Sequence, residues 1–288
     1  MIKYKNLSNI LEHLNIKKSF DVARYILREN HDINYFNNFK SIQTQTGGKL
    51  INFKYENHNV IFNIQKDVDR YIFSLHHNNN DNKDVCLIIF IADKIGYIEN
   101  ISYHKNCIDG LNYKGGGSTL LKIAINFLKQ NKNKYNINKI QLKDNAFKYC
   151  QESGTKIRLS LLSTLTRGDT WYGLYGFIPY DSDRDIQNKR GCELYFNNKK
   201  IIGSVKVNDT NVEQYIRDAL HKLKMEDYIE DIDELFKHYD NRPLSTFLYQ
   251  FLNDFQEICF IFDEFYIKLS QDLKIFDFHG SSFYLPLF

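Results

Sequence analysis

The chain has 288 residues, of which 43% are hydrophobic and 25% charged, as in ordinary globular proteins. Its formal net charge of +3 is too small for the concentrated basic surface that binds nucleic acid, so we expect no nucleic-acid partner. The residues near the N-terminus include charged ones, and no apolar run approaches the roughly 18 residues of a membrane span. We therefore expect a soluble, cytoplasmic protein with no membrane partner.

The cysteines, at positions 86, 107, 150, 192 and 259, form no C-x-x-C pair and no His/Cys metal spacing. We therefore expect neither a metal site nor a disulfide framework, but reduced and mostly buried thiols. Histidines 76, 77 and 104 can be interpreted as bases or ligands, although isolated histidines are more often surface residues. Frequent Asn, Ile and Lys is typical of coding from an AT-rich genome, such as that of an amoeba, a parasite or a large DNA virus active in host cytoplasm.

Residues 1–45 are predicted to form two short helices, which make a helical extension before the main domain. From residue 47 the hydrophobic period changes to two, as in β-strands. Polar turns separate the strands, and residues 93–96 have the form of a tight hairpin. The predicted strands span residues 49–55, 60–65, 70–76, 85–92 and 96–103.

Residues 112–119, with the sequence NYKGGGST, lie between the strand 96–103 and a predicted helix over residues 118–130. Glycines carry no Cβ atoms that would keep a bulky anion away from the backbone. The unpaired N–H groups and the dipole at a helix N-terminus both favour a phosphate group. The stretch is compatible with a phosphate cradle and also with a simple chain turn. It fits neither a Walker loop, because Lys114 precedes the glycines, nor a dinucleotide fingerprint, because Leu120 stands where the third glycine belongs.

The helix 118–130 is apolar over most of its circumference, which predicts packing against a sheet. Residues 140–142 are predicted to form a strand parallel to the strand 96–103, through a right-handed crossover. A helix is expected over residues 156–166, ended by Gly168. Residues 192–196 and 201–207 are expected to close the sheet as a hairpin across an Asn-Asn-Lys turn.

After residue 207 the pattern becomes helical. Thr210 and Glu213 have the spacing of a capping box, and further helices are expected over residues 227–239 and from Pro243 onward, the latter running beyond residue 258. The aromatic tail over residues 275–288 is expected to dock, as a strand.

Three stretches, in order, resemble the GCN5-related N-acetyltransferases. Asn112-x-x-Gly115-x-Gly117 is similar to the family's acyl-CoA loop, Gln/Arg-x-x-Gly-x-Gly/Ala. Trp171-Tyr172, followed after three residues by Gly176-Phe177, resembles its later signature, and residues 97–103 (YIENISY) resemble a polyamine acetyltransferase strand. The resemblance covers residues 85–180, with two departures. Leu165 stands where relatives carry Asn, and residues 104–110 are an insertion before the loop.

The resemblance implies an α+β fold, with a mixed twisted sheet flanked by helices. It implies an acyl-CoA-binding domain over residues 46–207, followed by a mainly helical region over residues 208–288 that has no named counterpart. It also implies acetyl-CoA as cofactor and a small-molecule or protein amine as acceptor. The cofactor-binding residues implied are Tyr103 (through its N–H, as oxyanion donor), Asn112, Lys114, Gly115, Gly116, Gly117, Ser118 and Thr119. Lys114 is equally compatible with a solvated lysine.

Acyl transfer requires a base to take the proton of the amine and a donor to protonate the departing thiolate. The resemblance implies Glu99 as the base, with a pKa raised by partial desolvation, and Tyr172 as the acid. The sequence is equally compatible with Glu99 as an outward-facing residue of an alternating strand and with Tyr172 as a core aromatic residue. The corresponding alternative for the whole protein is an inactive acyl-CoA-binding or structural protein of the same fold. The acceptor and the oligomeric state stay open.

Overall fold

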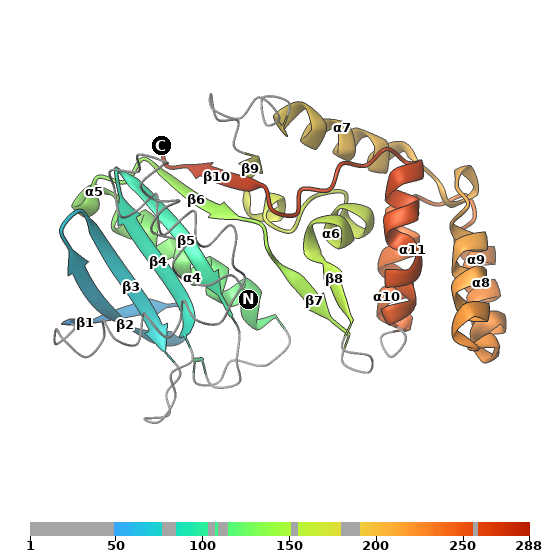
Figure 1. Cartoon of the computed structure of the whole chain (residues 1–288), viewed down its shortest axis with the longest axis horizontal. Coiled ribbons are helices and arrows are strands. Elements are labelled where there is room, and N and C mark those ends of the chain that lie inside the picture. Colours follow the sequence, from blue (N-terminus) through green and yellow to red (C-terminus); the bar gives the residue numbers. More distant parts are fainter. Residues whose placement is uncertain are drawn as a thin grey trace, which may run out of the picture.

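The computed structural model describes residues 49–76, 85–102, 107–108, 115–150, 155–179, 191–255 and 259–288. The two helices predicted within residues 1–45 lie outside these ranges. The described chain forms a mixed α+β structure, in which helical elements flank an eight-stranded, mostly antiparallel sheet (Figure 1). The expected fold class is thus confirmed at the level of a mixed sheet with helices.

The five predicted strands of the first half are confirmed and form an antiparallel meander. Asp93 and Lys94 both have positive φ angles, 51° and 63°, which is the backbone of a tight two-residue hairpin. The five strands are β1 (Lys49–Tyr55), β2 (His58–Asp67), β3 (Arg70–His76), β4 (Val85–Ala92) and β5 (Ile95–Ile101).

The predicted crossover is present, since helix α4 (Gly116–Gln130) leads from β5 to β6 (Lys139–Lys143) through the short helix α5 (Lys132–Tyr135), and β6 pairs parallel to β5. Helix α4 begins two residues earlier than predicted. Its apolar side chains lie buried against one face of the sheet, and burial of each large aliphatic side chain contributes about 1.5–3 kcal/mol.

The hairpin predicted over residues 192–207 is wrong, because this segment forms helix α7 (Gly191–Ser204). Its buried residues Gly191, Tyr195, Asn198 and Ile202 recur at helical spacing. The supposed turn residue Asn198 lies inside the helix, where its side-chain amide pairs with the backbone N–H and C=O of Phe276 at 2.9 and 2.8 Å. The polar residues that resemble a turn are therefore part of a helix. The side-chain amide of one of them, Asn198, forms hydrogen bonds with a segment distant in sequence.

Two other strands complete the sheet, β9 (Ile178–Pro179) and β10 (Ser282–Pro286). β10 lies between β6 and β9 and pairs antiparallel to both, so the docking of the C-terminal tail as a strand is confirmed. The helices that follow β9 in sequence are thus an insertion between two neighbouring strands, beside the sheet in Figure 1.

The segment before the insertion differs from the prediction in one place. Lys156–Arg158 is strand β8, which pairs with β7 (Phe147–Tyr149), and helix α6 (Leu159–Arg167) begins only after it. Gly168 ends α6 with a φ of 72°, in the left-handed region that glycine enters at no cost.

The predicted C-terminal helices are present. The capping box at Thr210 is not formed, because its hydroxyl donates to the Val207 carbonyl at 2.7 Å and α8 begins without a side-chain cap. The helix from Pro243 ends before residue 258, and a second helix follows it. The bounds are α8 (Val212–Leu223), α9 (Ile229–Tyr239), α10 (Leu244–Asp254) and α11 (Cys259–Asp272). In the described ranges, no helix combines the length and the apolar character needed to cross a bilayer.

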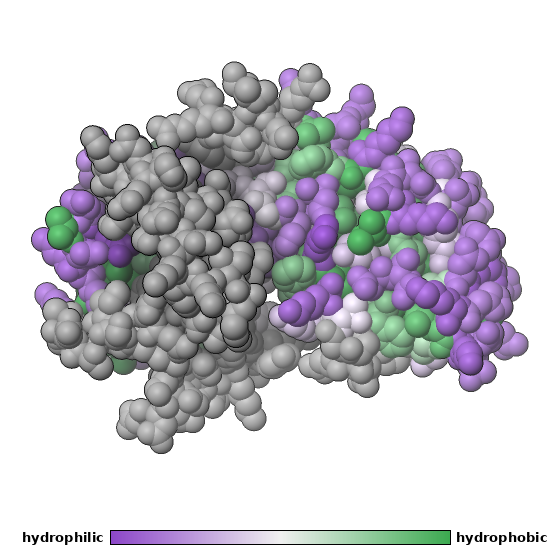
Figure 2. Space-filling model, in the orientation of Figure 1, coloured by the Kyte–Doolittle hydropathy of each residue, from purple (hydrophilic) through white to green (hydrophobic). Residues whose placement is uncertain are grey.

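Besides a small cluster of Ile72, Ile88 and Phe90, the described residues form two large hydrophobic cores. One lies between the sheet and α4, and the other is rich in phenylalanine and lies among α6, α8, α10 and α11. The outward face of the helices is mostly hydrophilic with scattered apolar side chains, as amphipathic helices require (Figure 2). The domain limits expected at residues 45 and 207 stay a prediction.

The expectation of reduced thiols is wrong for four of the cysteines, because Cys86 is bonded to Cys107 and Cys150 to Cys259. The partners are 21 and 109 residues apart in sequence, and in each pair the Cα atoms lie 5.8 Å apart. Cys192 stands outside both bonds. Spacing in the sequence cannot reveal such pairs, since only the fold brings the Cβ atoms within bonding distance.

Candidate functional site

The glycine turn forms the N-terminus of α4, where Gly115 is exposed and Gly116 is buried. Gly115 has a φ of 89° and precedes the first helical residue, with no side-chain cap on the N–H groups of the first turn. Among the described residues, a Cβ atom added at Gly115 or Gly117 would meet nothing within 4 Å. Ser118 and Thr119 are half-buried, and the Thr119 hydroxyl donates to the Gly115 carbonyl at 3.4 Å. Among the described residues, the space beside Gly115 and Gly117 is therefore open, which leaves room for an anionic group near the N–H groups of the first turn.

Packing places this N-terminus at the carboxyl end of the parallel strand pair. A Cβ added at Gly96, near the start of β5, would lie 2.6 Å from a methyl carbon of Leu128, near the end of α4. The helix therefore runs back along β5 in the opposite direction. From Leu128 to Gly116 it rises ~18 Å, and β5 advances ~17 Å from Gly96 to Ile101. The glycine turn and the end of β5 thus lie at about the same level.

β5 and β6 pair over only part of their length. The parallel ladder runs from Ile95 opposite Lys139 to Ile98 opposite Leu142, whereas β5 continues to Ile101. β5 and β6 are the parallel pair of the described sheet and have antiparallel neighbours on both sides. We call the place where the two strands stop pairing, just after Ile98 and Leu142, the fork.

Glu99 is the first residue beyond the fork. Ile98 pairs with Ile89 and Asn100 with Ile88, so Glu99 is an extra residue that forms a β-bulge. Its side chain is exposed. The partial desolvation expected for a sheet-centre carboxylate is therefore not found, and the bulge is what takes Glu99 out of the regular alternation.

Tyr172 lies on the other side of the fork, in the sheet core. Its ring packs against Phe283 at a centroid distance of 6.1 Å, and Phe283 is paired with Leu142, the last residue of β6 in the parallel ladder. The side chain is only 6% exposed. Burial, and secondarily the negative charge of Asp144, raise the pKa of the Tyr172 hydroxyl above its usual value. Tyr172 is therefore a core aromatic residue with a hydroxyl that strongly retains its proton.

The turn that carries Tyr172 is held by a group that the sequence did not reveal. Asp169 is buried. It accepts a hydrogen bond from the Tyr195 hydroxyl and forms an ion pair with Lys199, both at 2.6 Å. Thr170 Oγ1 accepts a hydrogen bond from the Gly173 N–H at 3.0 Å. The partners of Asp169 lie 26 and 30 residues away in α7, so no local sequence pattern signals these contacts.

A second group missed by the sequence analysis is Asp144, directly after β6. It is fully buried, and its only sequence signal is its place at the end of a strand. One carboxyl oxygen accepts the Ala146 N–H at 3.2 Å.

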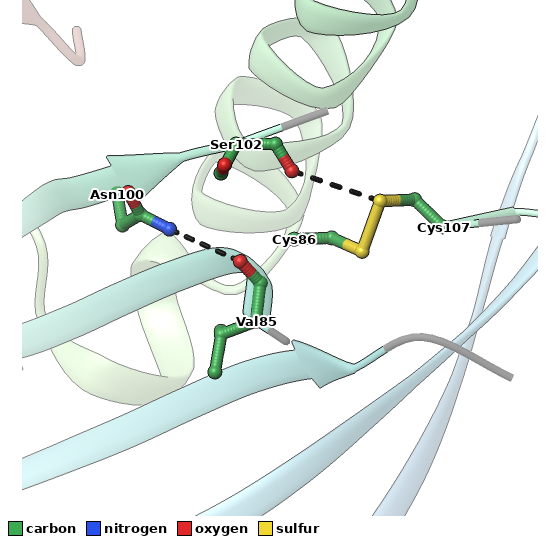
Figure 3. The surroundings of a disulfide bond; sticks show 5 residues. All are labelled: Val85, Cys86, Asn100, Ser102 and Cys107. Atoms are coloured by element: carbon green, nitrogen blue, oxygen red, sulfur yellow. Dashed lines mark hydrogen bonds between the residues drawn. A yellow bond between two sulfur atoms is a disulfide. The ribbon is translucent and has the colours of Figure 1, made fainter. Parts of the chain in front are cut away.

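Tyr103, Asn112 and Lys114 lie outside the described residues, as do His77 and His104. The chain on the β5 side of this gap is anchored. The Ser102 N–H donates to the Cys86 carbonyl at 2.9 Å, and Asn100 Nδ2 donates to the Val85 carbonyl at 3.2 Å. Figure 3 shows these residues beside the Cys86–Cys107 disulfide. The disulfide ties the segment that leads from β5 toward the glycine turn to the neighbouring strand β4.

A surface cavity of about 440 Å³ lies elsewhere, in the helical region. Its lining includes the carboxylates of Asp209 and Asp272, and Asp272 accepts a short hydrogen bond from the Tyr215 hydroxyl. Two carboxylates repel a polyanion. This cavity is therefore unsuited to a coenzyme diphosphate, whereas the glycine turn offers the appropriate donors.

The fold thus places Glu99, the glycine turn and Tyr172 around one end of the β5–β6 pair, although 73 residues separate the first from the last in sequence. Comparisons with protein-family models, with curated proteins and with solved structures found no match.

Proposed function

We propose that this chain is an N-acetyltransferase that transfers the acetyl group of acetyl-CoA to a primary amine, by direct attack within a ternary complex. The observation that carries the proposal is the side-chain-free N-terminus of α4 at the carboxyl end of the β5–β6 pair, where the two strands stop pairing. Backbone donors there suit the coenzyme diphosphate. The parallel ladder reaches only as far as Ile98 opposite Leu142, while β5 continues to Ile101, and a strand that runs on beyond the ladder suits an extended pantetheine arm.

In the proposed reaction, Glu99 accepts the proton of the amine, directly or through water. An amine with a pKa of about 10.4 is almost wholly protonated at neutral pH, so attack requires this step. The exposed position of Glu99 in the bulge supports access for an acceptor that arrives from solvent. Small amines and protein amines remain equally suitable acceptors.

The departing thiolate must then be protonated. Tyr172 is the proposed donor, placed beside the fork through its contact with Phe283. An unperturbed tyrosine that gives its proton to a thiol of pKa about 8.5 acts uphill by about 2 kcal/mol. Burial increases this difference, because it raises the pKa of Tyr172 further.

A second candidate function is acyl-CoA binding without turnover. It is favoured by the same two residues, because Glu99 lacks the burial that raises the basicity of a carboxylate and Tyr172 is nearly inaccessible. The coenzyme site is shared by both candidates, so binding alone does not distinguish them.

The test is incubation of the purified protein with acetyl-CoA and a panel of polyamines, amino sugars, amino acids and lysine-containing peptides. Free CoA is quantified by chromatography, because the cysteines of the protein react with thiol reagents, and calorimetry measures CoA binding in parallel. Amine-dependent CoA release that falls in Glu99→Gln and Tyr172→Phe supports the enzyme. Release unaffected by both changes keeps the activity and refutes these residues. Binding without release supports the second candidate, and absence of both refutes the two.

A further inference from the structure

The hairpin formed by β7 and β8 begins beside the fork. Just before β7, the Ala146 N–H donates to Oδ1 of Asp144, the residue that directly follows β6, at 3.2 Å. Just after β8, the Leu159 N–H donates to the Ala146 carbonyl at 2.9 Å and closes the base of the hairpin. The ring of Phe147 packs against the ring of His279, which precedes β10, at 4.7 Å between centroids. The hairpin therefore starts at the carboxyl end of β6 and projects beyond it (Figure 1).

The cross-strand register puts two aromatic and two basic side chains on one face of this hairpin. Phe147 is paired with Arg158 and Tyr149 with Lys156, and both pairs share a face because alternate residues of a strand point the same way. The opposite face carries Ile157, which is fully buried in the helical core. We call the face with the two pairs the hairpin face. Tyr149 is its more accessible ring, at 59% exposed against 36% for Phe147.

The two cations of the hairpin face differ in availability. The Arg158 guanidinium forms an ion pair with Asp277 at 2.7 Å, and the negative charge of Asp263 also acts on it. The Lys156 ammonium instead lies 5.4 Å from the centroid of the Tyr149 ring and forms no ion pair within the described part of the chain. The Arg158 end of the face is therefore neutralised, whereas the Lys156 end offers a positive charge beside an exposed aromatic ring.

An exposed aromatic ring beside an unneutralised lysine matches the chemistry of a nucleotide. Nucleobases stack on aromatic side chains, and a lysine ammonium binds phosphate. Coenzyme A carries such a group, an adenosine with a 3′-phosphate, at the end opposite its thiol. We propose that the hairpin face binds this 3′-phosphoadenosine, with the adenine stacked on Tyr149 and the 3′-phosphate paired with Lys156. The inference rests on the acyl-CoA site proposed above and adds a part of it that the glycine turn does not supply.

The place of the hairpin in the fold suits this part of the coenzyme. In the proposed complex the thioester lies at the fork and the diphosphate at the glycine turn, both at the carboxyl end of the β5–β6 pair. The adenosine is joined to the diphosphate, so it lies beyond the same end of the sheet. Tyr149 lies two residues further along β7 than Phe147, which is ~7 Å further out from the fork. The hairpin face thus extends from the end of the sheet at which the adenosine emerges.

Calorimetry with three ligands tests the inference. The ligands are CoA, dephospho-CoA, which lacks the 3′-phosphate, and adenosine 3′,5′-bisphosphate, which lacks the pantetheine arm. Tyr149→Ala should weaken the binding of all three about tenfold, because base stacking is lost. Lys156→Ala should weaken the binding of CoA and of the bisphosphate about fivefold, as expected for one exposed ion pair. It should leave dephospho-CoA binding unchanged, since that ligand has no 3′-phosphate.

Tyr249→Ala and Lys237→Ala are matched controls in the helical insertion. Tyr249 of α10 is 45% exposed and has Arg167 over its ring at 5.7 Å, much as Tyr149 has Lys156. Lys237 of α9 is exposed. Both control variants should bind all three ligands as the wild type does. Each substituted side chain is exposed, so every variant should keep the wild-type unfolding midpoint in urea to within a small shift.

The outcomes separate this inference from the proposed function. Wild-type affinity for CoA in Tyr149→Ala overturns the inference and leaves the acetyltransferase standing. Equal losses of CoA and dephospho-CoA binding in Lys156→Ala overturn the assignment of the 3′-phosphate to Lys156. A wild type that binds the bisphosphate through Tyr149 but does not bind CoA overturns the assignment to the coenzyme, because the nucleotide then comes from another source. A wild type that binds none of the three refutes the proposed function, and this inference with it.

Discussion

The Tyr195 hydroxyl donates a 2.6 Å hydrogen bond to Oδ1 of Asp169 and so joins α7 to the turn that carries Tyr172. The second carboxylate oxygen of Asp169 is paired with Lys199, one helical turn further along α7. Burial and this bond to Asp169 raise the pKa of Tyr195 above its usual value, so the hydroxyl remains a donor. The segment predicted as a β-hairpin is thus the helix that fixes the position of Tyr172.

Tyr195→Phe should destabilise the protein by about 1–3 kcal/mol, because it leaves one oxygen of the buried Asp169 without its donor. Urea unfolding measures the change. Tyr149→Phe is the control, since Tyr149 is 59% exposed and should be neutral. Equal unfolding midpoints for the two variants would contradict a stabilising role for this bond.

Gly173→Ala should destabilise the protein by about 1–3 kcal/mol through overpacking. The added Cβ would lie 2.0 Å from Asp169 Oδ1 and 2.6 Å from the Tyr195 hydroxyl, and both groups are held by their mutual bond. Gly203→Ala in α7 is the matched control, because its Cβ meets nothing within 4 Å. A Gly173→Ala protein as stable as the wild type would show that the turn is not constrained by Asp169.

Gly117→Ala separates stability from coenzyme binding. The free protein should gain about 0.5–1 kcal/mol, because alanine is the better helix former and its Cβ meets no atom of the described residues within 4 Å. CoA binding measured by calorimetry should weaken about tenfold or more, since that Cβ enters the space proposed for the diphosphate. Gly203→Ala should give a similar stability gain with unchanged binding, and weakened binding in that control would make the effect non-local.

Asp144 should make stability decrease as pH rises. A carboxyl whose folded-state pKa is raised from 3.8 to about 7 is uncharged in both states below its unfolded pKa, and it increasingly disfavours the folded state between the two values. The loss totals about 4 kcal/mol above pH 7. Asp144→Asn should remove this decrease, whereas Asp254→Asn, at an exposed carboxylate of α10, should retain it. Urea unfolding at several pH values between about 4 and 8, the range that the two pKa values span, measures the stability of each variant.

The two disulfides should contribute unequally. In the chain-entropy model, a bond that closes 109 residues stabilises by about 5 kcal/mol and one that closes 21 residues by about 3 kcal/mol. Cys259→Ser should therefore lower the unfolding temperature more than Cys107→Ser. Mass spectrometry after alkylation without reductant should find one modified cysteine in the wild type, Cys192, and five modified cysteines would refute both bonds.

Much of the sheet and the position of the glycine turn could be predicted because their signals are local. The period-two runs of β1 to β5 and the apolar helix α4 carry their own patterns within a few residues of sequence. The candidate site was only half accessible to such reasoning. Glu99 and Tyr172 were named from the sequence, whereas the bulge that exposes Glu99 and the carboxyls of Asp144 and Asp169 depend on pairing partners in other elements.

The sequence by itself determined that strands, a glycine turn and an apolar helix follow one another here, since hydrophobic periodicity and glycine backbone freedom act over one or two turns of chain. Only the tertiary structure decided that residues 191–204 are helical, which cysteines are bonded and that β10 returns between β6 and β9. Each of these outcomes depends on contacts between residues far apart in sequence, such as Asn198 with Phe276. Their free energies override a local turn or strand preference of a few tenths of a kcal/mol to about 1 kcal/mol per residue.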